Sequence, residues 1–285
     1  MNSKTAKSSM LLALTAVMWS IGGLFIKMVS WHALAIAGMR SLIASTVFIA
    51  FLLWKKEKLI VNKQILICAS SLAATMLLFV CANKLTTSAN AVVLQSSSPV
   101  HIIWISSLFF GQRYTRRDYI AVAATMAGII LFFCDSLTPG NLLGNILGLI
   151  SGVTMATMTV TTNHLPDQHS ASSALLLGHL ITALVGLPFL AAGSNDFTGK
   201  SFLCLFILGI FQLGIPYLMY GLCAQNTPPL LCSLIVMLEP LLNPVWVFLF
   251  MGELPGLYAI LGGAVVLVTI TLWCAGNTKK AVMQS

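Results

Sequence analysis

The chain has 285 residues, of which 58% are hydrophobic and only 8% are charged, and its mean hydropathy is +0.94. Soluble domains carry about 25% charged residues, so this composition excludes a soluble globular protein. The net charge of +8 would suggest nucleic acid as the partner of a soluble protein. Here the basic residues cluster in short loops, where they orient membrane helices instead. We therefore expect an all-α polytopic membrane protein, surrounded by membrane lipids and without a nucleic-acid partner.

Ten apolar runs are long enough to be predicted as transmembrane helices, since a span across the hydrocarbon core needs about 20 apolar residues. In chain order they cover residues 9–29, 33–54, 64–83, 88–110, 118–135, 141–162, 171–192, 201–222, 229–250 and 256–275. The opening MNSKTAK resembles the start of a signal peptide. The apolar run that follows is too long for one and lacks a small-x-small cleavage site, so we expect a retained first helix.

The basic residues predict the orientation of these helices. If the N-terminus is cytoplasmic, the cytoplasmic segments contain Lys4, Lys7, Lys55, Lys56, Lys58, Lys63, Arg113, Arg116, Arg117, Lys279 and Lys280. Only Lys84 and Lys200 then fall in outer loops. Because Lys and Arg accumulate in cytoplasmic loops, both termini are expected in the cytoplasm.

An internal repeat appears when the chain is shifted by 141 residues, which aligns Pro99 with Pro240 and Gly111 with Gly252. The aligned segments are SSSPVHIIWISSLFFGQ and MLEPLLNPVWVFLFMGE. The match predicts two halves, 1–138 and 139–285, of five helices each. An odd number of helices per half inverts the second copy. Inverted repeats with broken helices are typical of transporters that bind substrate near the midplane. The alternative is a chance proline match between two apolar helices.

Several motifs together resemble the EamA-type transporters of the drug/metabolite transporter superfamily. They are Trp19 with Gly22 and Gly23, Arg40, the run from Asn83 through Ala89-Asn90-Ala91 to Ser98-Pro99, Gly111-Gln112, Glu239-Pro240 and Gly252-Glu253. The resemblance implies a ten-helix carrier in the inner membrane of a bacterium, with a central cavity lined by the first four helices of each half. Members move amino acids, amines, other metabolites and drugs, often with proton exchange. Gln112 departs from the family, in which Gly-Glu is usual at this point.

Glu239 is the only acidic residue near the middle of a predicted span. Ionisable groups at that depth are costly and mark functional sites by default. Glu239 would carry a coupling proton or bind a cationic substrate group; alternatively, it braces the fold by pairing with Arg40 or a helix N-terminus. Pro99, Pro240 and Pro244 free backbone carbonyls at similar depths. They would act as hinges or as static kinks.

Helical spacing selects further candidates for the substrate-binding wall. Positions i, i+4 and i+7 share one helix face. Two sets have this spacing: Glu239, Asn243 and Trp246, and Ser97, His101 and Trp104. Asn90 continues the second set, and Gln95 lies on its flank. The tryptophans could instead face lipid. Histidine titrates near physiological pH, so His101 is a second candidate for proton coupling, or else a hydrogen-bonded structural group.

Aromatic residues form a last group of candidates. Tyr217, Tyr220 and Trp19 could form an aromatic wall that favours amines or aromatic compounds through cation–π contacts. Simple packing is the alternative. Arg40 would suit a substrate carboxylate, or it would serve as a structural or gating pair. His179 is a further candidate of the same kind as His101.

No enzyme is indicated, because the chain has no HExxH, P-loop or nucleophile motif. Its seven cysteines are scattered, without CxxC or metal-like spacing, so no metal or other cofactor is expected. The prediction is a secondary transporter of a small metabolite, with proton coupling through Glu239 and with export suggested by the resemblance alone. Alternatives are a flippase for lipids or lipid-linked substrates, or a facilitative uniporter or channel in which Glu239 is structural. The expected partner is a small-molecule substrate, and the expected assembly is a monomer or weak homodimer.

Overall fold

A computed structural model describes residues 3–137, 139–191, 195–242, 246 and 256–283. All regular structure in these ranges is helical. The elements are α1 (Ser3–Trp19), α2 (Gly22–Lys27), α3 (Ala33–Lys55), α4 (Lys63–Leu85), α5 (Ser88–Gln95), α6 (Ser98–Phe110), α7 (Arg116–Phe132), η1 (Cys134–Ser136), α8 (Leu142–Asn163), α9 (Gln168–Gly186), η2 (Leu187–Leu190), α10 (Gly199–Ile207), the π-helix η3 (Leu208–Gly214), α11 (Ile215–Ala224), α12 (Pro229–Val236) and α14 (Leu257–Met283).

Seven helical segments of the described chain are long and apolar enough to cross a membrane. They are Ala33–Lys55, Lys63–Leu85, Ala89–Phe110, Leu142–Asn163, Gln168–Leu190, Gly199–Ala224 and Leu257–Ala275. Two shorter apolar helices cover Lys7–Trp19 and Pro229–Leu242. The prediction of an all-α polytopic membrane protein is therefore confirmed.

Two broken helices carry the repeat that the sequence indicates. When the chain is shifted by 141 residues, the bounds of α5 coincide with those of α12, and the turn at Ser96 coincides with the turn at Met237. Helix resumes at Ser98 in the first copy and at Leu238 in the second. Both breaks lie just before the aligned prolines, which lack the backbone N–H and clash with the preceding turn. The aligned prolines thus interrupt equivalent helices.

The backbone carbonyls freed at the first break are covered by neighbouring groups. The Ser97 hydroxyl donates to the carbonyl of Leu94 over 2.6 Å. Gly152 of α8 lies so close that an added Cβ would be 2.9 Å from the same carbonyl oxygen and 3.1 Å from that of Gln95. Broken helices are tolerated in membranes where side chains and neighbouring helices satisfy the backbone in this way.

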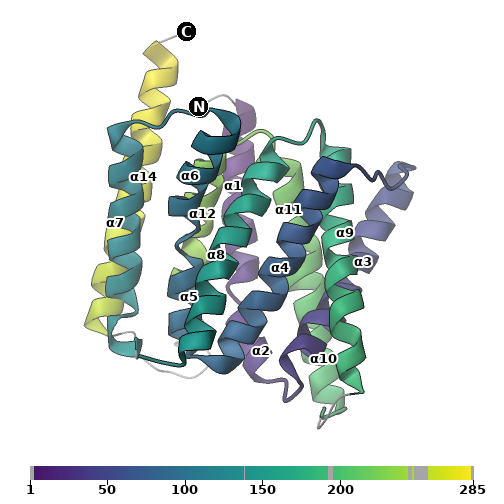
Figure 1. Cartoon of the computed structure of the whole chain (residues 1–285). Coiled ribbons are helices and arrows are strands. Elements are labelled where there is room, and N and C mark those ends of the chain that lie inside the picture. The colour runs from purple at the N-terminus through teal and green to yellow at the C-terminus, as the bar shows by residue number, and fades with distance from the viewer. Residues whose placement is uncertain (1–2, 138, 192–194, 243–245, 247–255, 284–285) are drawn as a thin grey trace.

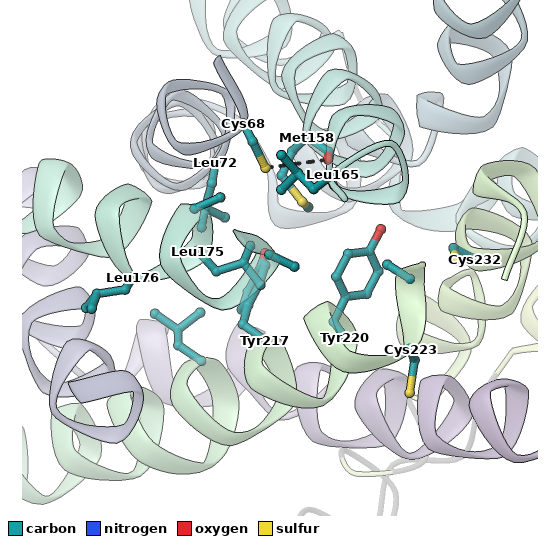
Figure 2. Close-up of a cluster of buried hydrophobic side chains, with 14 of the residues drawn as sticks. Cys68, Leu72, Met158, Leu165, Leu175, Leu176, Tyr217, Tyr220, Cys223 and Cys232 are labelled. Carbon is teal, nitrogen blue, oxygen red and sulfur yellow. Dashed lines mark hydrogen bonds between the residues drawn. The ribbon is translucent and has the colours of Figure 1, made fainter. Parts of the chain in front are cut away.

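The long helices run side by side, and α1 begins at the same end of the bundle at which α14 ends (Figure 1). α4 packs against α8 and α9, and α3 packs against α9, while α7 and α14 form a pair at one edge. A buried cluster fills the space between α4, α8, α9 and α11; it includes Cys68, Met158, Leu175, Tyr217 and Tyr220 (Figure 2). This core holds all three predicted aromatic site residues, Trp19, Tyr217 and Tyr220, in place.

Candidate substrate-binding site

Glu239 lies in the turn of helix that follows the break after α12, and it lines two small cavities. Their volumes are about 40 and about 20 Å³, and both are also lined by Val92 and Pro240. A cavity of this size holds a water molecule but no metabolite. The Glu239 side chain is half-buried and lies between these two cavities.

The first cavity is enclosed by α1 and α2 on one side and by α4, α5 and η3 on others. Its remaining lining residues are Trp19, Ser20, Gly22, Ile26, Phe79, Asn83 and Gln212. Trp19 and Gln212 are only 3% and 8% exposed, yet the indole Nε1 and the amide Oε1 have no hydrogen-bond partner in the described chain. A buried polar atom left unsatisfied costs about 1–3 kcal/mol. Such atoms beside a carboxylate are suited to binding a polar ligand.

Breaks in the helices bring these groups to the cavity. α1 ends at Trp19. The hydroxyl of the next residue, Ser20, donates to the carbonyl of Val17 over 2.6 Å. It also accepts a 2.7 Å hydrogen bond from Nε1 of Trp246. Gln212 lies in the π-helix, a form that is rare and frequent at functional sites. The amide of Gln212 lies against Gly22, where an added Cβ would be 2.8 Å from Nε2.

The second cavity is lined by Gln95, Ser96, Met155, Val236 and Met237 in addition to the shared residues. The Gln95 amide donates to the hydroxyl of Ser151 in α8 over 2.7 Å. At the helix breaks the two repeats also meet directly, because the hydroxyls of Ser98 and Ser233 are 3.2 Å apart. The site therefore lies where the two broken helices approach each other.

The three predicted aromatic residues gather beside the first cavity. The ring centroids of Trp19 and Tyr217 are 4.6 Å apart, and those of Trp19 and Tyr220 are 5.7 Å apart. Tyr220 donates to the hydroxyl of Thr159 over 2.9 Å, which fixes its ring. Trp19 alone of the three lines the cavity. The aromatic wall thus has one face toward Glu239 and two rings packed behind it.

Glu239 has no hydrogen bond or ion pair with any residue in the described ranges; Tyr217 lies within electrostatic range of it. Arg40 also interacts electrostatically with Tyr217, but it forms no ion pair with Glu239 in the described chain. The Arg40 side chain is 1% exposed, its Nη2 is 3.7 Å from the sulfur of Met76, and its Nε lacks a partner. Arg40 lines neither cavity. The direct Arg40–Glu239 brace is therefore absent from this structure.

His179 belongs to the same buried interior as Arg40, with which it interacts electrostatically. Its ring is 0% exposed and contacts Phe48 and Tyr217, with centroid distances of 5.5 and 5.4 Å. Neither ring nitrogen has a hydrogen-bond partner among the described residues. It does not line either cavity.

Other predicted wall residues are dispersed. Trp104 is 76% exposed, so the structure places it on the outer surface of the bundle and not at the centre. Asn90 is buried but its amide donates to Thr86 and Asn145, at 3.4 and 3.2 Å, in a separate polar cluster. His101 lies 3.2 Å from the hydroxyl of Ser97, outside both cavities.

The remaining predicted residues are the prolines and one asparagine. Pro99 is buried directly after the first break, and Pro240 lines both cavities. Asn243 and Pro244 lie outside the described residues. The sequence analysis missed Phe79 and Val92 as lining residues, since apolar positions in apolar helices carry no distinguishing signal.

A sequence profile of the EamA-like transporter family matches residues 6–134 and again residues 142–274. The chain belongs to this family. Its members are transporters and not enzymes, and the two matches show its two-repeat architecture. Within the described residues, no group of three or more His, Cys, Asp or Glu side chains is arranged to hold a metal ion.

Relatives of this EamA-family chain are distant. It is 24% identical over 96% of its length to an uncharacterized transporter of Archaeoglobus fulgidus, covering 99% of that protein. It is 24% identical to the pseudopaline exporter CntI of Pseudomonas aeruginosa, with 67% of each chain aligned. It is 27% identical to human solute carrier family 35 member G1, with 70% of this chain and 60% of that one aligned. A solved crystal structure shares the fold with a TM-score of 0.78 at 17% identity, covering 93% of this chain and 95% of that chain.

Proposed function

We propose that this transporter is a secondary carrier that moves a small metabolite with a positively charged group, and that Glu239 binds that group. The observation that carries the proposal is the position of Glu239: it lines both cavities at a helix break and has no counter-charge in the described chain. A carboxylate in the membrane interior needs a partner. An ammonium group from the substrate, or a proton, would supply it.

The aromatic residues support a cationic substrate. Trp19 lines the first cavity beside Glu239, and Tyr217 and Tyr220 pack against it. A cation over an aromatic face gains about 2 kcal/mol when it is desolvated. The unpartnered amide oxygen of Gln212 would add a hydrogen-bond acceptor for an ammonium group. A neutral sugar or an anion would gain neither contact.

We propose ten transmembrane spans in two inverted halves, residues 1–138 and 139–285, in the inner membrane of a bacterium with both termini in the cytoplasm. An even number of spans is supported by the start of α1 and the end of α14, which lie at the same end of the bundle (Figure 1). The loop before α7 also lies at that end and contains Arg113, with Arg116 and Arg117 in the first turn of the helix. Basic residues at the end with the termini favour a cytoplasmic location for it.

Alternating access would then move one half against the other around the fixed site. The two cavities that described residues form at Glu239 are too small for a metabolite, which is compatible with an occluded state. Export is supported by the name of one relative, the pseudopaline exporter. Exchange of a proton for the cation at Glu239 would drive export against a gradient; His101, outside both cavities, is the second candidate for this coupling.

The proposal is tested by thermal unfolding of the detergent-purified protein against amino acids, polyamines, quaternary amines, sugars and nucleosides. A ligand that binds only the folded state stabilises it by about 2.7 kcal/mol at a hundred times its dissociation constant. We expect stabilisation by a cationic compound. Glu239→Gln should abolish it, whereas Glu57→Gln, the same change in the loop between α3 and α4, should not. Stabilisation that survives Glu239→Gln in full would refute the role of Glu239.

A further inference from the structure

A groove separate from the central site runs between α7 and α14, at the edge of the bundle shown in Figure 1. It has a volume of about 310 Å³, much larger than the two central cavities. Its lining residues are Arg117, Ile120, Ala121, Ala124, Thr269, Leu272 and Trp273. All but the arginine and the threonine are apolar or aromatic. The groove is therefore mainly apolar, with one positively charged side chain at its end.

The packing of the two helices explains the groove. α7 and α14 approach each other closely at Gly128 and Gly262, where a Cβ on Gly262 would lie 2.5 Å from the carbonyl oxygen of Gly128. One and two turns away along α7, the small side chains of Ala124 and Ala121 leave space between the helices. From Arg117 to Ala124 the groove extends about 10 Å along α7, since an α-helix rises about 1.5 Å per residue. That length covers most of one leaflet of a hydrocarbon core about 30 Å thick.

The charged end of the groove is free to bind an anion. Asp118 is the acidic residue next to Arg117, but both of its oxygens are engaged. Oδ2 accepts from the backbone N–H and the hydroxyl of Thr115, at 2.7 and 2.9 Å, and Oδ1 accepts from Nε1 of Trp273 at 2.9 Å. Arg113, Arg116 and Arg117 are exposed, and none forms an ion pair with a described residue. Three arginines against the one carboxylate of Asp118 leave this end with a net positive charge.

We propose that this groove binds an anionic phospholipid, with the phosphate at Arg117 and one acyl chain between α7 and α14. The apolar lining suits the chain, and the unpaired guanidinium of Arg117 complements a headgroup with a net negative charge. The indole of Trp273, hydrogen-bonded to Asp118, is held at the level of the headgroup, where tryptophan is favoured at membrane interfaces. A zwitterionic lipid would gain less, because its ammonium group carries the same sign of charge as Arg117.

The test compares dioleoyl phosphatidylglycerol with dioleoyl phosphatidylcholine, which have the same chains, as additives to the delipidated protein in detergent. The unfolding midpoint and the lipid adducts seen by native mass spectrometry are recorded for the native chain, Arg117→Gln and Arg113→Gln. The second variant removes the same charge in the loop before α7, outside the groove. Ala124→Phe fills the groove and leaves every charge in place.

We expect phosphatidylglycerol to raise the midpoint of the native chain more than phosphatidylcholine does. Arg117→Gln should weaken phosphatidylglycerol binding about fivefold, as one basic residue near an anionic surface does, whereas Arg113→Gln should retain most of it. Ala124→Phe should lose the adducts of both lipids at this site. The proposal would be overturned if the two lipids had equal effects or if both arginine variants lost binding equally. It would also be overturned if this face formed a dimer contact between two copies of the chain.

Discussion

The contact between α3 and α9 gives a prediction that depends only on backbone geometry. Gly38 faces Gly186, and a Cβ added at Gly38 would lie 2.6 Å from the Gly186 carbonyl carbon and 2.7 Å from the backbone nitrogen of Leu187. Small residues let membrane helices approach this closely. Because the obstructing atoms belong to the backbone, no side-chain rotation relieves the clash in Gly38→Ala.

The expected loss of stability follows from two opposing effects. Ordinary carbon contacts begin near 3.5 Å, so the helices must separate by most of an ångström, and such overpacking costs about 1–3 kcal/mol. Alanine is better than glycine in a helix interior by up to about 1 kcal/mol. The net destabilisation of Gly38→Ala should be about 1–2 kcal/mol, which lowers the unfolding midpoint by several degrees at about 2–4 °C per kcal/mol.

The assay is thermal unfolding of the purified variants in one detergent. Gly199→Ala is the control, because an added methyl group there meets no atom within 4 Å; it should unfold at or slightly above the native midpoint. The double variant of Gly38 and Gly186 should lose less than the sum of the two single losses, since one methyl group already separates the helices. A midpoint for Gly38→Ala equal to that of Gly199→Ala would refute the close contact.

Three further predictions concern single side chains. Tyr220→Phe removes the bond to Thr159 and should cost about 1 kcal/mol; in unfolding experiments Thr159→Val should add little to it, and fully additive losses would contradict the bond. Asp167 caps α9, and a hydrogen bond from the backbone N–H of Ser170 lowers the pKa of its carboxyl group. The contribution of Asp167 to stability is therefore present above the unfolded pKa of about 3.8 and is lost as the pH falls through the lower folded pKa. Asp167→Asn should therefore lose less stability than the native chain between pH 7 and pH 3, and parallel losses would argue against this effect. Gly22→Ala should push the flexible Gln212 amide aside, weakening ligand binding in calorimetry while leaving the unfolding midpoint nearly unchanged; unaltered affinity would remove Gln212 from the site.

Much of the fold was accessible from the sequence because membranes impose strong patterns. Apolar runs had to be helical, and the shift of 141 residues that aligned Pro99 with Pro240 also aligned the bounds of α5 and α12. The aromatic group of Trp19, Tyr217 and Tyr220 was also predicted and does gather beside one cavity. The predicted helices follow from the length of the apolar runs, and the predicted helix breaks follow from the positions of the prolines.

A helix break separates Asn90 from the other members of the predicted stripe, Ser97, His101 and Trp104. Positions spaced by four and three residues share a face only in a continuous helix, and this helix breaks at Ser96 and Ser97. Beyond the break Ser97 and His101 stay adjacent, 3.2 Å apart, and Trp104 lies exposed in the same helix. Gln212, a polar residue of the predicted eighth span, lines the first cavity from a π-helix, a form that sequence spacing alone does not predict.

The central claim is that Glu239 binds the transported cation and the exchanged proton, and transport driven by a pH gradient tests it most directly. Proteoliposomes would be given the cationic ligand found by thermal unfolding, with and without a pH gradient, using the native chain, Glu239→Gln and Glu57→Gln. We predict that the gradient drives accumulation by the native chain and by Glu57→Gln but not by Glu239→Gln. Accumulation by Glu239→Gln at the native rate would show that Glu239 carries neither charge.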